Sequence, residues 1–85
     1  MPWSLVVSRR AERDMAVIEP SARETVLSDI RKADLDPGAV NLARLKGRPG
    51  ECRIRVGSWR VILELDSKSG TMIVTRVLNR RDAYR

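Results

Sequence analysis

The pattern of apolar positions changes its period about halfway along the chain. Residues 3–7 are short, apolar and β-branched, which is typical of a strand. Ser8 can then cap a helix over residues 9–18. Apolar side chains recur in that segment at helical spacing, namely Ala11, Met15 and Ile18. The first part of the chain therefore predicts a strand followed by a helix with one apolar stripe.

A second helix should follow after a break at Pro20. The residue before a proline is pushed away from the α region, so the first helix has to end by Glu19. Residues 21–24, Ser-Ala-Arg-Glu, form a capping-box pattern, which predicts a helix from there to about Ala33. Its apolar face consists of Ala22, Val26, Leu27 and Ile30. Two helices with so short a break should form a hairpin on one face of a sheet.

The second half of the chain has the two-residue period of strands. Residues 36–38, Asp-Pro-Gly, are a turn signal, and the stretch to residue 50 mixes a short apolar turn with a Gly/Pro loop. Apolar positions then alternate with polar ones in two segments: Ile54 and Val56, then Val61, Leu63 and Leu65. Residues 57–58 and 67–70 are the expected hairpin turns.

Residues 72–78 are apolar on both faces, which favours an interior strand of the sheet. The expected fold class is α+β: an N-terminal strand, a two-helix hairpin and a three-stranded antiparallel meander in one small twisted sheet. With 85 residues, we expect a single domain over residues 1–85.

Composition excludes several classes of site. The chain has one cysteine and no histidine, so no internal disulfide, thiol redox pair or His/Cys metal site is expected. The acidic residues in the second half of the chain are scattered among arginines, which is more typical of ion-pair partners than of a magnesium site. They are Glu51, Glu64, Asp66 and Asp82. We expect no metal and no cofactor. No apolar run approaches the roughly 18 residues of a membrane span and no signal peptide is visible, so a cytoplasmic protein is expected.

The charge is unevenly distributed along the chain. The net charge is +6, from 17 Lys and Arg against 11 Asp and Glu. Residues 1–43 have a net charge of −1 and residues 44–85 a net charge of +7. Fourteen of the cations are arginine, whose planar guanidinium binds phosphate oxygens bidentately. Arginines can be a solubilising surface, but the asymmetry favours a polyanionic partner: RNA, DNA or an acidic protein segment.

The strand pattern gathers many of these arginines. Arg53 and Arg55 alternate with apolar residues, so both should project from the outer face of one strand. Arg60 opens the next strand after a two-residue turn and should lie near this pair. Three further candidates follow the last strand: Arg80, Arg81 and Tyr84. The result would be a concave cationic patch for a nucleic-acid backbone, edged by Tyr84 and Trp59 unless these rings only cover the core.

Metal-free cleavage of RNA is the chemistry that such a patch suits. The ribose 2′-OH attacks the adjacent phosphate, while arginines hold the phosphate and offset its developing charge. Arginine stays protonated and cannot accept the proton. Tyr84 is the candidate acid or base, and only if nearby cations lower its pKa from roughly 10.

Four segments together resemble the RelE/ParE superfamily of toxins from type II toxin–antitoxin systems. They are residues 8–14 (SRRAERD), 45–47 (LKG), 52–66 (CRIRVGSWRVILELD) and 76–85 (RVLNRRDAYR). Each segment is loose by itself, but their order and spacing are specific, and the resemblance covers nearly the whole chain. The fold of that superfamily is a compact sheet with a two-helix hairpin, which agrees with the pattern above.

The resemblance implies a toxin of the RelE branch, which enters the ribosomal A site and cleaves the mRNA there. Four residues are then expected to bind RNA: Lys46, Arg53, Arg55 and Arg81. Three are expected to be catalytic: Arg60 and Arg80 at the scissile phosphate, and Tyr84 in base stacking or proton transfer. Some active relatives have lysine in place of Arg53 and Arg55, and many have histidine in place of Asn79. These departures leave phosphate binding intact but weaken the case for proton transfer.

The resemblance also implies partners and alternatives. The expected partners are the ribosome with its mRNA and an acidic cognate antitoxin with a tail that folds on binding. Operator DNA would be bound only through the toxin–antitoxin complex, and no membrane partner is expected. The alternative is the ParE branch, which poisons DNA gyrase and cleaves no RNA. A further alternative is a catalytically inactive module that binds its antitoxin and nucleic acid. The presence of Arg60, Arg80 and Tyr84 favours the RelE branch.

Overall fold

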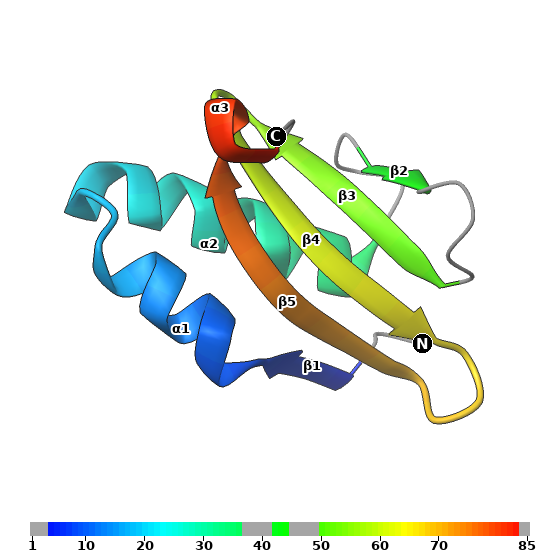
Figure 1. Ribbon diagram of the computed structural model, residues 1–85. Helices are drawn as coiled ribbons and strands as arrows, with labels where there is room; N and C mark the ends of the chain where they lie inside the picture. The colour runs from blue at the N-terminus through cyan, green and yellow to red at the C-terminus, as the bar shows by residue number, and fades with distance from the viewer. Residues whose placement is uncertain (1–3, 37–41, 45–49, 84–85) are drawn as a thin grey trace.

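The computed structural model describes residues 4–36, 42–44 and 50–83 (Figure 1). Its elements in chain order are β1 (Ser4–Val7), α1 (Arg9–Ala16), α2 (Pro20–Leu35), β2 (Leu42–Arg44), β3 (Glu51–Val56), β4 (Trp59–Asp66), β5 (Thr71–Asn79) and α3 (Arg80–Ala83). Within these ranges, no helix has both the length and the hydropathy needed to cross a bilayer.

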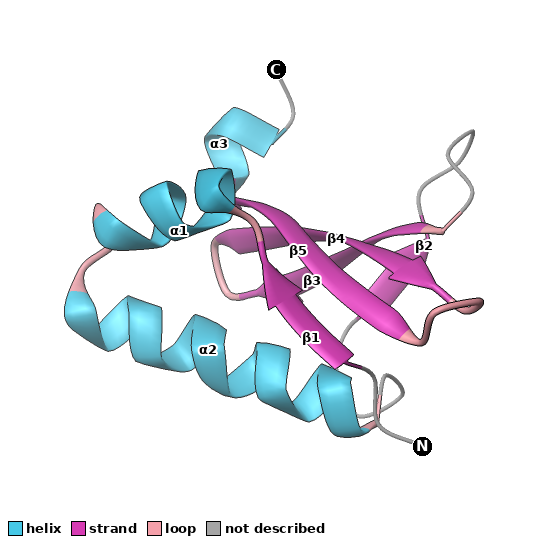
Figure 2. Ribbon diagram, turned by 90° about the horizontal axis from the view of Figure 1, so that it is seen from below, coloured by secondary structure: helices cyan, strands magenta, loops and turns pink. Residues whose placement is uncertain are grey.

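The described strands form one sheet in the order β1-β5-β4-β3-β2. β1 runs parallel to β5, and the other neighbouring pairs are antiparallel. The predicted fold is confirmed, with β3, β4 and β5 as the meander and β5 as an interior strand. The short edge strand β2 and the helical turn α3 were not predicted. α2 lies across one face of the sheet, α3 lies on the opposite side, and α1 continues from β1 alongside β5 (Figure 2).

The core fills the space between the two long helices and one face of the sheet. The two helices and the link between them contribute Ala11, Met15, Ile18, Val26, Ile30 and Ala33. The strands contribute Cys52, Ile54, Val56, Val61, Leu63, Met72, Val74 and Val77. Because side chains alternate along a strand, the opposite face carries a different set, which we call the arginine face: Arg53, Arg55, Arg60, Ile62, Arg76 and Leu78. The predicted apolar stripes are confirmed, although Ala22 and Leu27 are only partly buried.

The helix boundaries differ from the expected ones by a few residues. α1 ends at Ala16 rather than near residue 18. α2 begins at Pro20, with Glu19 as its N-cap residue, so the predicted capping box is wrong. Proline is favoured in the first turn of a helix because its missing N–H would have no partner there. Ser21 consequently lies inside the first turn, where its hydroxyl donates to a Glu19 carboxylate oxygen at 3.1 Å.

A bulge in β5 decides which side chains its second half presents. The register with β4 shifts by one residue at Thr75, which is the extra residue. Met72 and Val74 are buried before the bulge, and Val77 is buried after it. In an unbroken strand Arg76 would share the buried face with Val74, because strand residues two apart share a face. The bulge instead turns Arg76 to the arginine face and keeps Val77 in the core.

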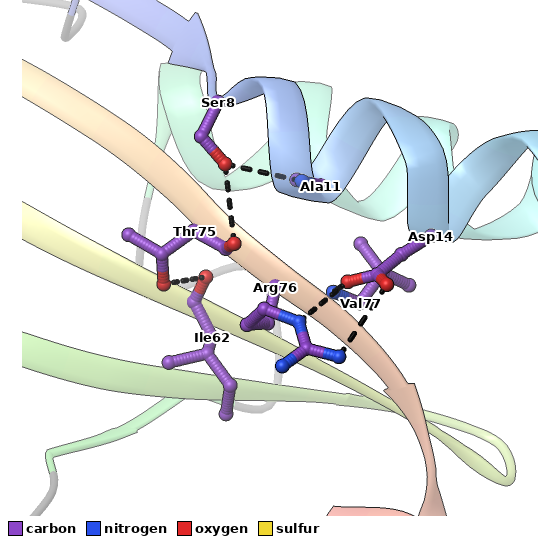
Figure 3. Close-up of polar contacts among 7 residues, drawn as sticks. All are labelled: Ser8, Ala11, Asp14, Ile62, Thr75, Arg76 and Val77. Atoms are coloured by element: carbon purple, nitrogen blue, oxygen red, sulfur yellow. Dashed lines mark hydrogen bonds and ion pairs between the residues drawn. The ribbon is translucent and has the colours of Figure 1, made fainter.

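We expect Thr75→Val to lower the free energy of unfolding by about 1 kcal/mol. The Thr75 hydroxyl donates to the Ile62 carbonyl at 3.1 Å, and the Ser8 hydroxyl donates to the Thr75 carbonyl at 3.1 Å (Figure 3). Valine keeps the side-chain shape but removes the first of these bonds. Urea titration measures the loss. The control is Thr25→Val, whose hydroxyl bonds to the Ser21 carbonyl on an exposed helix surface. A loss as large in the control would contradict a special role for the bulge.

Among the glycines that the structure describes, Gly50 is the one whose replacement should cost most stability, because it precedes β3 in a left-handed conformation and lies against β4. Its φ is +81°, and a Cβ built there would lie 2.9 Å from the Leu65 carbonyl oxygen. Gly70 has a similar φ of +68° but no atom within 4 Å of its Cβ position. We expect Gly50→Ala to destabilise by about 2 kcal/mol and Gly70→Ala by about 1 kcal/mol in thermal unfolding. Equal losses would mean that the backbone conformation alone, and not the contact with Leu65, sets the cost.

Candidate nucleic-acid interface

Two predicted RNA-binding residues lie on β3. Arg53 and Arg55 alternate with the buried residues Cys52, Ile54 and Val56, so both point to the arginine face as the spacing predicted. Arg55 is exposed and Arg53 is partly buried. The shared face follows from strand geometry alone, since one face of β3 is covered by the core.

Arg60 lies in the predicted position but in an unexpected environment. The β3–β4 register pairs it directly with Arg55, so the two residues share the arginine face. Its side chain is nevertheless only 4% exposed. Nη1 donates to the Gly57 carbonyl at 2.9 Å and to the Trp59 carbonyl at 2.8 Å. Nε is buried and has no hydrogen-bond partner within the described part of the chain. The guanidinium of Arg60 is thus bound to the turn between β3 and β4.

The end of β5 brings two more candidates to the same turn. Asn79 ends the strand, and its side-chain oxygen accepts a hydrogen bond from the Arg81 N–H at 3.2 Å. The Arg80 N–H donates to the Ser58 carbonyl at 2.6 Å. Asn79 is therefore a strand-end residue whose side chain caps α3. Arg80 and Arg81 are exposed on α3, which lies on the side of the sheet away from α2 (Figures 1 and 2).

Trp59 does not edge the arginine face, so of the two alternatives left open by the sequence, the one in which its ring covers the core is confirmed. It precedes Arg60 on β4 and points to the opposite side, where it packs against the core. It also lines a depression of about 240 Å³ between α1 and the end of β5, together with Val17 and Asn79. Tyr84 and Lys46 lie outside the described residues, and their expected roles stay predictions.

Arg76 forms an ion pair with Asp14 of α1 (Figure 3). Its Nε donates to Oδ2 of Asp14 at 2.8 Å and its Nη2 to Oδ1 at 3.4 Å. The backbone N–H of Val77 donates to the same Oδ2 at 2.9 Å. One carboxylate thus fastens α1 to β5 by both a side chain and the main chain. Arg76 is for this reason an anchor of the fold, and its charge is neutralised by a neighbour.

This arrangement suits the binding of a polyanionic backbone. The arginines on or beside the arginine face come from three elements: Arg53 and Arg55 of β3, Arg60 of β4, and Arg80 and Arg81 of α3. Guanidinium groups bind phosphate oxygens and offset negative charge, but they do not accept a proton at neutral pH. The chain contains no histidine, and its described residues include no group of three His, Cys, Asp or Glu that could hold a metal ion. The described side chains can hold and stabilise a phosphate.

A comparison with protein families decides the class of the protein. The sequence profile of the family described as "ParE toxin of type II toxin-antitoxin system, parDE" matches residues 5–84. The chain belongs to this toxin family. Its predicted membership of the RelE/ParE superfamily is thereby confirmed. A comparison of the toxin with curated protein sequences found no significant match.

Solved structures resemble the toxin over nearly its full length. The RelB–RelE antitoxin–toxin complex from Methanococcus jannaschii matches with a TM-score of 0.79 and 22% identity, covering 93% of this chain and 94% of that chain. The RelBE2 toxin–antitoxin complex from Mycobacterium tuberculosis matches with a TM-score of 0.82 and 22% identity, covering 94% and 100%. The isolated RelE toxin of E. coli matches with a TM-score of 0.78 and 17% identity, covering 91% and 83%. At identities this low, the structural similarity shows a shared fold and nothing more.

Sequence reasoning missed the role of Asp14 in this toxin. One signal was present, because Asp14 lies three residues after Ala11 and four before Ile18, at the border of the apolar stripe of α1. An acidic residue at that border can reach a partner on the element that the stripe packs against.

Proposed function

We propose that this toxin is a ribosome-dependent mRNA endonuclease of the RelE type. The observation that supports the proposal best is the gathering of arginines from β3 and α3 around one face and one turn of the sheet. Such a surface suits a single-stranded RNA backbone, whose phosphates are bound by guanidinium groups irrespective of sequence. The net charge of +7 on residues 44–85, which include the arginines of this surface, agrees with the proposal.

The proposed reaction is attack of the ribose 2′-OH on the adjacent phosphate. Arg53, Arg55 and Arg81, with Lys46, hold the RNA backbone so that the attacking oxygen lies in line with the leaving oxygen. Arg80 offsets the negative charge that develops on the scissile phosphate. Arg60 lies on the same face of the sheet, but its guanidinium is buried.

Proton transfer is the step for which this site offers the fewest suitable side chains. Arginine cannot serve as the base, so Tyr84 is the proposed group for proton transfer or for stacking on a base. In both roles it would act on a substrate that the ribosomal A site has already bent and positioned. This dependence explains in physical terms why cleavage should require the ribosome.

The proposed protein partner is a cognate antitoxin with an acidic segment. Two of the similar structures are complexes of a RelE toxin with an antitoxin. A segment rich in Asp and Glu would complement the exposed cations Arg55, Arg80 and Arg81 and would cover the surface proposed for RNA. Operator DNA would be bound through the antitoxin in such a complex.

Inhibition of DNA gyrase is the second candidate function, because the matching family profile is that of ParE. The burial of Arg60 also favours this alternative, since it removes one accessible cation from the proposed catalytic set. A catalytically inactive module that binds its antitoxin and nucleic acid is the third alternative, and it predicts activity in neither assay.

The deciding experiment is primer extension on an mRNA translated in a purified system, with and without the toxin. The control contains the same RNA and toxin but no ribosomes. We expect cuts that appear only with ribosomes. Intact mRNA and normal translation would overturn the proposal, and a supercoiling assay with purified gyrase would then test the ParE alternative. Loss of supercoiling without loss of translation would establish gyrase as the target.

A further inference from the structure

The turn between β3 and β4 is held by hydrogen bonds from two arginines. Arg60 Nη1 donates to the carbonyls of Gly57 and Trp59, at 2.9 and 2.8 Å. The carbonyl between them, that of Ser58, accepts the backbone N–H of Arg80 at 2.6 Å. The carbonyls of three consecutive residues, the two turn residues and the first residue of β4, are thus engaged, two by the side chain of Arg60 and one by the backbone N–H of Arg80.

These contacts make Arg60 an unsuitable ligand for an external phosphate. Its side chain is 4% exposed, and its Nε is enclosed. To reach a bound RNA, the guanidinium would have to leave both carbonyls, and the turn would lose the donors that satisfy them. Arg80 is in the opposite situation, because its side chain is exposed while its backbone N–H is fixed to the turn.

We propose that Arg60 is a positioning residue that fixes the β3–β4 turn, so that the Ser58 carbonyl holds the start of α3 and places Arg80 and Arg81. The effect of Arg60 on activity rests on the proposed RNA cleavage, whereas its effect on the position of α3 does not depend on that proposal. Arg60 acts through donated hydrogen bonds and needs no contact with the phosphate. The contribution of its charge to the reaction is small, whereas that of Arg80 is large.

The test separates the donors of Arg60 from its charge. Arg60→Met removes both. Citrulline at position 60 is neutral but keeps the shape, the Nε–H and one terminal NH₂ that can donate to the same carbonyls. It can be introduced by ligating a synthetic segment at Cys52, the one cysteine of the sequence. Arg31→Met, an exposed arginine on α2, is the matched control.

The first measurement is hydrogen exchange of the Arg80 amide, which needs no activity. We expect Arg60→Met to accelerate this exchange at least about tenfold, while citrulline and Arg31→Met leave it within about threefold of the natural protein. Unchanged exchange in Arg60→Met would overturn the proposal. If Arg60→Met does not fold, the citrulline protein carries the test: fast exchange of its Arg80 amide would overturn the proposal.

The second measurement is the rate of ribosome-dependent mRNA cleavage. We expect it to fall about 10²-fold in Arg60→Met and less than about tenfold with citrulline. A citrulline protein with a protected Arg80 amide and a cleavage rate reduced about 10²-fold or more would show that the charge of Arg60 acts on the phosphate, which would overturn the proposal. If the natural protein itself cuts no mRNA, the proposed function fails, and the exchange measurement alone decides the role of Arg60.

Discussion

Arg80→Ala should reduce the rate of ribosome-dependent mRNA cleavage about 10²–10³-fold, the usual cost of removing one group that stabilises the charge of a transition state. The backbone N–H that joins Arg80 to the Ser58 carbonyl remains in the variant, so α3 should keep its position. Because the side chain is exposed, the free energy of unfolding should change by less than about 0.5 kcal/mol. Single-turnover cleavage with excess toxin measures the rate of the chemical step apart from binding.

The matched control for this variant is Arg13→Ala, an exposed arginine on α1. It makes the same change in net charge, so any general loss of attraction to RNA appears in both proteins. We expect the control to lose less than about threefold in cleavage rate. A full cleavage rate in Arg80→Ala, or an equal loss in Arg13→Ala, would remove the support for a specific role of Arg80. Retained growth inhibition by Arg80→Ala would point to gyrase instead.

Much of the fold could be predicted because the spacing of apolar residues can be read from positions that are close together in the sequence. The change from helical spacing at Ala11 and Met15 to alternation at Ile54 and Val56 identifies the helices and the strands correctly. The two hairpin turns followed from residues 57–58 and 67–70. The short edge strand β2 was missed because its three residues carry too few positions to show a period.

The bulge at Thr75 could not be predicted from the alternation. The segment 72–78 has apolar residues on both faces, and its two polar residues, Thr75 and Arg76, are adjacent, so the alternation did not show which of them is the extra residue. The bulge depends on contacts across the fold, since its bonds come from Ser8 and from Ile62. Without it, the face of Arg76 is assigned wrongly, because every residue after the bulge changes sides.

The sequence predicted on which face the arginines of the candidate site lie, but it did not predict the burial and the hydrogen bonds of their side chains. Spacing alone placed Arg53, Arg55 and Arg60 on one face, which the register confirms. The burial of Arg60 depends on how its side chain folds back onto the turn, and no sequence period reports that. The side of Trp59 was left open, although it is adjacent to Arg60 and strict alternation would have placed it on the core side.

Asp14→Ala should destabilise the toxin by about 3 kcal/mol in urea or thermal unfolding. The substitution removes the ion pair with Arg76, which is partly exposed and contributes at most about 1 kcal/mol. It also leaves the N–H of Val77 without its acceptor at the edge of β5, which costs about 1–3 kcal/mol. Arg76→Met removes only the first contribution and should cost about 1 kcal/mol.

The control for these two variants is Asp29→Ala, since Asp29 pairs with Lys32 at 3.9 Å within one helix. An exposed pair of this kind contributes at most about 1 kcal/mol. The order of losses is the informative result: Asp14→Ala should lose clearly more than Arg76→Met, because the carboxylate of Asp14 also satisfies the main chain of β5. Equal losses in Asp14→Ala and Arg76→Met would mean that the ion pair is the whole contribution. In that case α1 would be joined to the second half of β5 by the Ser8 contact and by apolar packing, and the Asp14–Val77 bond would add nothing measurable.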